Sequence, residues 1–266
     1  MESILKNIMD NLSPAWGVCK TSMLDGHLLP CGGKIKIPQG AASVLVALFP
    51  YYLGEDQYEG SNISRYAVVP DYHAVVLKRL NTAVELLCDE YPSESFVPFT
   101  DNSPVPEVKA AANAGLGVIG DNNLLINPDF GSWVFIGEII TTLKTEAYKT
   151  PGIHNCTGCG KCVAACPAGI LGRLNFEKSH CLSAITQSKG TLTPGQANLI
   201  KSAGCAWGCD ICQTVCPMNN SAKITPIEEF KENVLTHIKQ GDDSTGRAYA
   251  WRGRAVIERN LAILER

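Results

Sequence analysis

Two cysteine-rich runs in the second half of the chain contain the residues best suited to do chemistry. The first run, CTGCGKCVAACP at 156–167, contains Cys156, Cys159, Cys162 and Cys166, followed by a proline. This C-x2-C-x2-C-x3-C-P spacing is that of bacterial ferredoxins, whose thiolates hold 4Fe–4S clusters. A tight loop presents the first three sulfurs to one cluster, while the fourth cysteine ligates the other cluster. The run therefore predicts one half of a two-cluster site.

The second run, CAWGCDICQTVCP at 205–217, repeats the C-x2-C-x3-C-P part of the first. Ala206 stands where another cysteine would complete the repeat, so the eighth ligand must come from elsewhere. The residues alone leave Cys181 and Cys205 open for this role. Exchange of the fourth cysteine between the runs assigns one cluster to Cys156, Cys159, Cys162 and Cys216, and the other to Cys166, Cys209, Cys212 and one of Cys181 or Cys205.

A zinc site and a set of buried free cysteines are the alternatives for these runs. Zinc motifs rarely place three cysteines at two-residue gaps, and they do not end in C-P with a partner run. Nine of the twelve cysteines lie between 156 and 216, and the chain shows no export signal. This distribution favours clusters over an extracellular disulfide framework. Two clusters form a path for electrons, and we expect the residues before them to receive those electrons.

The composition is that of an ordinary globular protein. The 266 residues are 45% hydrophobic and 18% charged, with a formal net charge of -3. This balance argues against a surface built wholly for nucleic acid. The longest apolar stretch, 42–53, is too short for a membrane helix, and the N-terminus has no signal-peptide core. We therefore expect a cytoplasmic protein with no membrane partner.

Hydrophobic patterns divide the chain into three expected parts. These are an α/β domain at 1–150, a cysteine-rich module at 151–222 and C-terminal helices at 223–266. Asp71 and Ser103 are each placed to cap a helix, and the second of these helices ends at a glycine. Helices are expected at 2–12, 71–91, 103–115, 192–203, 226–240 and 247–265, and strands at 16–20, 42–49, 95–101 and on both sides of a turn at 128–131.

The segment AGLGVIG at 114–120 contains the pattern G-x-G-x-x-G. The dinucleotide-binding version of this pattern follows a strand and opens a helix. Here it follows an expected helix and leads into an expected strand. The context favours a glycine-rich turn that lets the backbone pass close to something bulky.

Several segments together resemble the epoxyqueuosine reductase family, and more distantly the reductive dehalogenases. They are ASVLVALFPYYLGE, ISRYAVVPDYHAVVLKRL, FTDNSPVPEVKAAANAGLGVIGDNNLLINPDFGSWVFIGEIITT, CTGCGKCVAACPAGIL and GCDICQTVCP, in that order over residues 40–220. The resemblance implies a cobalamin-binding α/β domain of nitroreductase-like fold. It also implies a ferredoxin-like module with two 4Fe–4S clusters and a short C-terminal helical segment.

The resemblance also implies roles for particular residues. Asp101 corresponds to the family's acidic proton donor, and Cys181 is preferred over Cys205 as the eighth cluster ligand. The implied cobalamin pocket draws on RYAVVPDYH and on GLGVIGDNNLLINPDFGSW. These segments supply Arg65, Tyr66, Asp71, Tyr72, His73, Gly117, Gly120, Asn127 and Ser132.

The implied activity is that of an oxidoreductase in queuosine biosynthesis. The two clusters pass electrons from an external low-potential donor, a ferredoxin or flavodoxin, to the corrinoid. The reduced cofactor then drives reductive deoxygenation of a tRNA nucleoside, and an acid protonates the anion that forms, which contributes about two to four orders of magnitude in rate.

The chain departs from the family in ways that bear on the substrate. Members that act on tRNA carry C-terminal helical repeats, and AYAWRGRAVIERNLAILER at 248–266 resembles only the opening of one. We therefore interpret 223–266 as a truncated repeat remnant. The segment 22–40 has no counterpart that we recognise. Two alternatives follow: the same cofactors acting on a small molecule or on cobalamin itself, and a non-catalytic electron-transfer protein.

Overall fold

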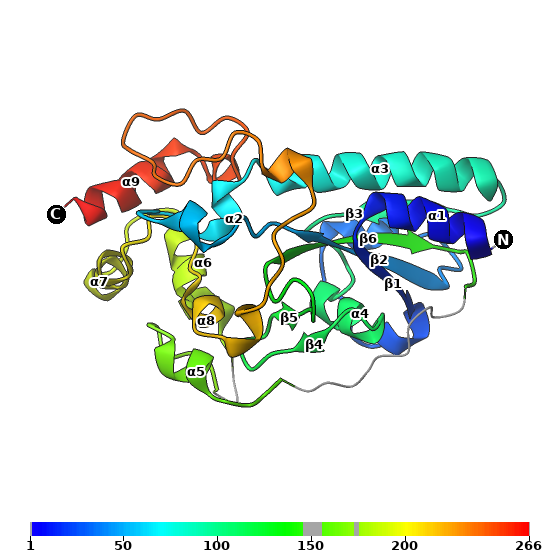
Figure 1. Ribbon diagram of the computed structural model, residues 1–266, viewed down its shortest axis with the longest axis horizontal. Helices are drawn as coiled ribbons and strands as arrows, with labels where there is room; N and C mark the ends of the chain where they lie inside the picture. The colour runs from blue at the N-terminus through cyan, green and yellow to red at the C-terminus, as the bar shows by residue number, and fades with distance from the viewer. Residues whose placement is uncertain (1, 146–155, 173–175, 266) are drawn as a thin grey trace.

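A four-stranded antiparallel sheet forms the centre of the first domain (Figure 1). In the computed structural model, which describes residues 2–145, 156–172 and 176–265, the strand order is β1-β2-β6-β3. All eight residues of β2 are buried, which explains why this strand reads as one continuous apolar run. The strands are β1 (Ala15–Lys20), β2 (Ser43–Pro50), β6 (Val134–Thr141) and β3 (Phe96–Phe99). The expected α/β class is confirmed.

Two helices, α1 (Glu2–Leu12) and α3 (Tyr72–Glu90), cover one face of the sheet (Figure 1). The apolar stripe of α3 meets Leu45 and Phe49 of β2 in one core. Asp71 caps α3 as predicted, because its carboxylate accepts the backbone N–H of His73 at 3.1 Å. The cap therefore fixes where the first two side chains of α3 lie.

The opposite face is covered by α4 (Glu107–Asn113) and by a small ribbon of β4 (Val118–Ile119) and β5 (Leu125–Ile126). The predicted turn at 128–131 is confirmed, since Asn127 and Gly131 exchange backbone hydrogen bonds of 2.8 and 2.9 Å. The two strands that flank this turn pair with different partners. β5 pairs with β4, and β6 lies between β2 and β3.

The predicted helix cap at Ser103 is wrong. Helix α4 begins only at Glu107, with Pro106 in the cap position. Prolines at 104 and 106 keep the residues before them extended, and this delays the helix. The Ser103 hydroxyl instead accepts the backbone N–H of Val105 and donates to the buried carboxyl of Glu138. Residues 100–106 are therefore a loop, which we call the Asp101 loop.

The cysteine-rich module consists of short helices joined by loops. The predicted helix near 192–203 is confirmed as α7, which has a capping box between Thr193 and Gln196 and ends at the left-handed Gly204. Helices α5 and α8 pack against each other. The helices are α5 (Lys161–Ala165), α6 (Leu182–Gln187), α7 (Pro194–Ala203) and α8 (Ile211–Thr214).

Several shorter elements complete the described chain. A four-residue helix, α2 (Arg65–Val68), precedes α3. The turns of 3-10 helix are η1 (Thr21–Leu24), η2 (Gly32–Lys36), η3 (Glu55–Tyr58), η4 (Lys178–His180), η5 (Pro217–Asn219), η6 (Glu228–Phe230) and η7 (Ala250–Arg252).

The predicted helix at 226–240 is wrong, because only the turn η6 forms there. Phe230 is fully buried in the core between α3 and the sheet, and the Thr225 hydroxyl donates to the carbonyl of Pro50 at 2.6 Å. These contacts fix residues 225–230 against the first domain, and we call this segment the strap. The helix predicted at 247–265 is confirmed over its second part as α9 (Arg254–Leu264), where Asn260 donates to the carbonyls of Thr186 and Ala206. The division at 150 and 222 stays a prediction.

Every helix in the described part of the chain is too short or too polar to cross a lipid bilayer.

Candidate functional site

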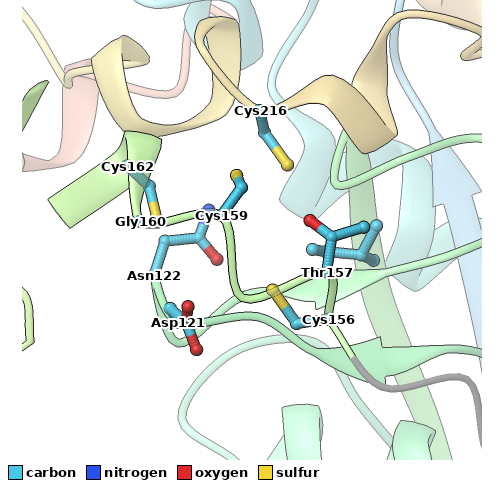
Figure 2. A pocket seen from close by; sticks show the side chains of 9 residues that line it. Asp121, Asn122, Cys156, Thr157, Cys159, Gly160, Cys162 and Cys216 are labelled. Carbon is cyan, nitrogen blue, oxygen red and sulfur yellow. The ribbon is translucent and has the colours of Figure 1, made fainter. Parts of the chain in front are cut away.

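Four cysteines from both runs line one pocket beside the β4–β5 ribbon (Figure 2). Figure 2 shows the four sulfur atoms arranged around a common space, and the pocket has an empty volume of about 270 Å³, open solvent included. This is the group that the ligand exchange assigns to the first cluster. Its members are Cys156, Cys159, Cys162 and Cys216.

Three further cysteines of the two runs, Cys166, Cys209 and Cys212, lie where α5 meets α8. Cys209 interacts electrostatically with Cys166 and Cys181. Cys212 interacts with Cys181 and Cys209. Cys181 is therefore close to two residues that the sequence assigns to the second cluster.

Cys205, the alternative eighth ligand, has partners of its own. Its thiol donates to the backbone carbonyls of Trp207 at 3.1 Å and Gly208 at 3.6 Å. Burial, followed by the charge of Asp210, raises the pKa of this thiol to about 12. The geometry favours Cys181 over Cys205, because Cys181 interacts with both Cys209 and Cys212, whereas Cys205 interacts with Cys209 and bonds to the backbone.

The donor chemistry of both groups fits iron–sulfur clusters. Burial is the largest cause that raises the pKa of the Cys209 thiol to about 11 and that of Cys212 to about 12. Such thiols stay protonated in the absence of metal. They release their protons when they bind iron, because the positive charge of the metal replaces that of the proton. Gly158 and Gly160 have φ angles of 62° and 69°, which let the first loop turn between its sulfurs. Among the described residues, no three His, Cys, Asp or Glu side chains are grouped to hold a single metal ion.

Asp101 meets side chains from the start of α3. Its Oδ2 accepts the hydroxyl proton of Tyr72 and lies 2.8 Å from Nε2 of His73. The other ring nitrogen of His73, Nδ1, lies 2.6 Å from Oδ1 of Asp71. The rings of Tyr72 and His73 stack with centroids 4.1 Å apart. The four side chains therefore form one hydrogen-bonded group, which we call the Asp101 cluster.

The pKa values within the Asp101 cluster place its proton on the histidine at neutral pH. Hydrogen bonds with Asp101 and then with Asp71 raise the pKa of His73 to about 9. Burial opposes ionisation of Asp101, but hydrogen bonds with His73 and Tyr72 outweigh it and lower the pKa of the carboxyl. The side chain of Asp101 is 49% exposed and that of His73 is 37% exposed. A ligand can therefore reach the pair from solvent.

The Asp101 cluster lies at the boundary with the cysteine-rich module. Lys178, in the turn before Cys181, interacts electrostatically with Asp101. Tyr66 packs edge-on against Tyr72, with ring centroids 6.3 Å apart, and its hydroxyl accepts a hydrogen bond of 3.4 Å from Gln187 of α6. An electron acceptor at this boundary would contact both the carboxylate and the module that carries the clusters.

Arg65, which the sequence places in a cofactor pocket, has its charge paired within the protein. Its guanidinium donates two hydrogen bonds, of 2.8 and 2.7 Å, to the carboxylate of Glu55. The same group lies over the ring of Trp133, 4.5 Å from the centroid. The side chain of Arg65 is only 11% exposed. Arg65 therefore stabilises the packing between the first domain and the cysteine-rich module.

The polar groups of Asn127 and Ser132 are also used internally. The amide of Asn127 donates to the carbonyl of Leu116 at 2.6 Å and its oxygen accepts two backbone N–H groups of the following turn. The Ser132 hydroxyl donates to Gln213 of α8 at 2.9 Å, which joins the sheet to the module. Both residues hold the fold at the edge of the first cysteine group.

The glycines of the G-x-G-x-x-G pattern approach their own β5 strand. A Cβ at Gly117 would lie 2.3 Å from the carbonyl oxygen of Ile126, and one at Gly120 would lie 2.5 Å from Oδ1 of Asn122. The pattern follows α4, contains β4 and leads into β5, so it lies between a helix and a strand as expected from the sequence. Gly117 therefore admits the backbone of β5, and Gly120 admits the side chains of Asn122 and Ile126.

Two carboxyls beside Asp101 were not found from the sequence. Glu107 opens α4 directly after the Asp101 loop, and Glu138 lies fully buried in β6. Neither belongs to a recognisable motif. A glutamate inside the otherwise apolar strand VFIGEIIT was the one signal available for Glu138, since a buried strand rarely accepts an isolated charge.

Comparison with known families agrees with this arrangement. Residues 36–102 match a family described as "Epoxyqueuosine reductase QueG, DUF1730", and residues 155–219 match a family described as "4Fe-4S double cluster binding domain". An epoxyqueuosine reductase of Leadbetterella byssophila is 36% identical over 237 residues, which is 87% of this chain and 77% of that protein. The chain belongs to the epoxyqueuosine reductase family. Its cysteine-rich module is thus a double-cluster domain, as the cysteine spacing predicted.

Other family members are longer than this chain. An epoxyqueuosine reductase of Listeria monocytogenes is 34% identical over 207 residues, which cover 73% of this chain and 54% of that protein. The chain therefore spans about half the length of this relative.

Solved structures of the family share the fold. A structure of epoxyqueuosine reductase with an epoxyqueuosine-modified tRNA-Tyr stem loop matches with a TM-score of 0.76 and 23% identity, over 99% of this chain and 80% of that one. The Bacillus subtilis enzyme, solved with a catalytic aspartate loop swung out of the active site, matches equally well, with a TM-score of 0.76. A catabolic reductive dehalogenase matches with a TM-score of 0.52 and 16% identity, over 97% of this chain and 36% of that one. The predicted kinship of the two folds is confirmed.

Proposed function

We propose that this chain is a reductase that removes the epoxide oxygen of epoxyqueuosine in tRNA, with two 4Fe–4S clusters and a corrinoid as cofactors. The observation that carries the proposal is the Asp71–His73–Asp101 chain at the boundary with the double-cluster domain. Family membership supports the reaction, and the stem-loop complex of a related reductase supports an RNA substrate.

The reaction needs both electrons and protons. Conversion of the epoxide to an alkene breaks two C–O bonds, consumes two electrons and two protons and releases the oxygen as water. The clusters would supply the electrons one at a time. The protein must hold a proton where the oxygen departs, and this is the role that we propose for Asp101.

The proton begins on Nε2 of His73, because that imidazole stays charged up to a pKa of about 9. It moves across 2.8 Å to Oδ2 of Asp101, and the carboxylic acid formed in this way donates it to the departing oxygen. The second proton would come from solvent, to which the pair is exposed. Asp71 accepts from Nδ1 and so keeps the ring oriented. General acid catalysis of this kind contributes about 10²- to 10⁴-fold in rate.

The residues at the boundary fit a corrinoid in part. The partly exposed Tyr66, Tyr72 and His73 would contact it, while Arg65, Asn127, Ser132 and the two glycines would support the wall behind them. A bound corrinoid would supply a strongly reducing metal centre at this place. The B12-dependent chemistry named for a dehalogenase of related fold supports this choice.

The two cysteine groups would hold the clusters and bring electrons to the boundary. We propose Cys156, Cys159, Cys162 and Cys216 as ligands of the first cluster, and Cys166, Cys181, Cys209 and Cys212 as ligands of the second. Cys159 is exposed, so the first cluster reaches the surface. An external low-potential donor, such as a ferredoxin or flavodoxin, would deliver electrons there.

The proposal is tested with anaerobically reconstituted protein and an epoxyqueuosine-containing RNA stem loop. With cobalamin and a chemical reductant we expect conversion to queuosine, detected by mass spectrometry, and with cobalamin omitted we expect none. Reducible clusters without turnover would favour an electron-transfer protein. Cobalamin binding with turnover of a halogenated aromatic compound, and none of the RNA, would favour a small-molecule substrate.

A further inference from the structure

Two buried carboxyl groups lie beneath the Asp101 loop, and the proposed proton transfer uses neither of them. Glu107 receives the backbone N–H of Asp101, and Glu138 accepts the hydroxyl of Ser103. One oxygen of each carboxyl, Oε1, is buried and has no hydrogen-bond partner among the described residues. The loop therefore rests on two carboxyls that are only partly hydrogen-bonded.

The loop above these carboxyls has a backbone conformation that needs support. Asp101 and Asn102 have φ angles of 54° and 45°, in the left-handed region that residues other than glycine adopt rarely. On its outer side the loop is held by the segment 27–36, where Leu29 donates to the carbonyl of Pro104 at 2.7 Å. The carboxyls below and this segment above together keep Asp101 in place.

Charged and titratable groups reach Glu107 from every element packed against it. Burial, and then the negative charge of Asp101, raise the pKa of Glu107 to about 7, while Lys178 and His73 act in the opposite direction. Behind it, burial and then the charge of Glu107 raise the pKa of Glu138 well above its usual value. The remaining titratable neighbour is Tyr72, which interacts with Glu107 electrostatically. Glu107 is thus the member of this set that changes charge near neutral pH.

Ionisation of Glu107 and the position of the loop must be linked. With the loop in, one oxygen of the carboxylate is shielded from water, and the group faces the charge of Asp101. With the loop out, water would solvate the carboxylate, and its affinity for a proton would fall toward that of a free glutamate. A group that binds its proton more tightly in one conformation stabilises that conformation when the group is protonated.

We propose that Glu107 is a positioning residue for Asp101: when neutral it packs under the loop and keeps Asp101 against His73, and when ionised it drives the loop outward. The purpose of this movement rests on the proposed role of Asp101 as the proton donor. In the Bacillus subtilis reductase such a loop is swung out of the active site, so an outward position is available to this fold.

Hydrogen exchange of the full chain, with its clusters reconstituted and no corrinoid or substrate, tests the proposal. Protection of residues 100–106, corrected for the intrinsic exchange rate, is measured at pH 6 and at pH 8. His73 also titrates with the loop position, because its raised pKa of about 9 depends on Asp101 and would fall toward its usual value with the loop out. The comparison is therefore made in His73→Gln, where we expect a fall of about tenfold, as linkage requires when a pKa of about 7 drops to that of a free carboxyl.

Two variants identify the group responsible. In the His73→Gln background, Glu107→Gln, which does not ionise in this range, should keep the protection at pH 8 within twofold of its value at pH 6. Glu85→Gln in the same background, on the exposed side of α3, should behave like His73→Gln alone. Equal protection of His73→Gln at both pH values would overturn the proposal even if the variant that adds Glu107→Gln failed to fold, and so would a tenfold fall in that variant.

The outcomes separate this inference from the proposed function. Turnover lost in Asp101→Asn, with a pH-independent loop, would leave the reductase proposal intact and remove the role of Glu107. A pH-dependent loop with full turnover in Asp101→Asn would keep the role of Glu107 in holding the loop and remove Asp101 as the acid.

Discussion

Nε2 of His73 lies 2.8 Å from Oδ2 of Asp101. Because Asp71 occupies the other ring nitrogen, the histidine bridges two carboxylates and carries the charge that both of them favour. Despite burial, the hydrogen bonds with His73 and Tyr72 lower the pKa of Asp101, so the carboxyl is ionised at neutral pH and has no proton of its own to donate. Paired with a charged imidazole, it has a proton within one hydrogen bond. The acid of the proposed reaction is therefore the pair.

Replacement of Asp101 by asparagine removes the oxygen that passes the proton to the substrate. We expect Asp101→Asn to lower the single-turnover rate of epoxyqueuosine reduction by about 10²- to 10⁴-fold, the usual contribution of a general acid. Iron content and the visible spectrum of the clusters should not change, since the side chain lies outside both cysteine groups. Asp89→Asn, on the exposed surface of α3, is the matched control. A rate equal to that of the control would remove Asp101 from the chemistry.

The pH dependence of the rate should follow His73. Its pKa is raised from 6.5 to about 9 by its two carboxylate partners, so the imidazole stays charged at neutral pH and the ion pairs are lost as the pH rises through 9. We expect the single-turnover rate to fall above pH 9 in the wild type. In His73→Gln, which has no titrating ring, this fall should disappear and the rate at pH 7 should be lower. An unchanged high-pH fall in His73→Gln would assign it to another group.

The identity of the eighth cluster ligand is tested by the iron content of two serine variants. Two 4Fe–4S clusters hold about eight iron atoms per chain. Cys181→Ser should retain about half of this iron after reconstitution, because Cys181 lies beside Cys209 and Cys212. Cys205→Ser should retain nearly all of it, since the Cys205 thiol bonds to backbone carbonyls. The reverse pattern would assign the ligand to Cys205.

Local signals in the sequence were sufficient where one short segment determines the structure. The cysteine spacing predicted which thiols share a pocket, because ligands two residues apart are fixed by the loop that carries them. Asp71 was recognised as a helix cap because the cap bonds to a backbone group only two residues away. The fold class followed from the apolar runs of the strands.

Features that depend on distant contacts were not recognised. Ser103 looked like a helix cap, but its hydroxyl bonds to Glu138, which is 35 positions away along the chain. The family resemblance placed Arg65 in the cofactor pocket, and its ion pair with Glu55 could not be read from the sequence. The proposed role of Glu107 depends on its position beneath the Asp101 loop, and the spacing of residue types does not reveal that position. Tertiary packing decides each of these cases.

The strap at 225–230 is another case in which tertiary contacts outweigh the local sequence pattern, and it leads to a testable prediction. The sequence suggested a separate helix, whereas Phe230 is fully buried in the core formed by α1, α3 and the sheet, beside Phe135 with ring centroids 5.5 Å apart. Phe230→Ala should therefore destabilise the first domain by about 3–5 kcal/mol, the usual cost of emptying a buried aromatic site. Thermal unfolding of the cluster-loaded protein under argon measures the loss. Phe176→Ala, at a side chain 41% exposed, is the control. A loss as small as that of the control would mean that the strap contributes nothing to the first domain's stability.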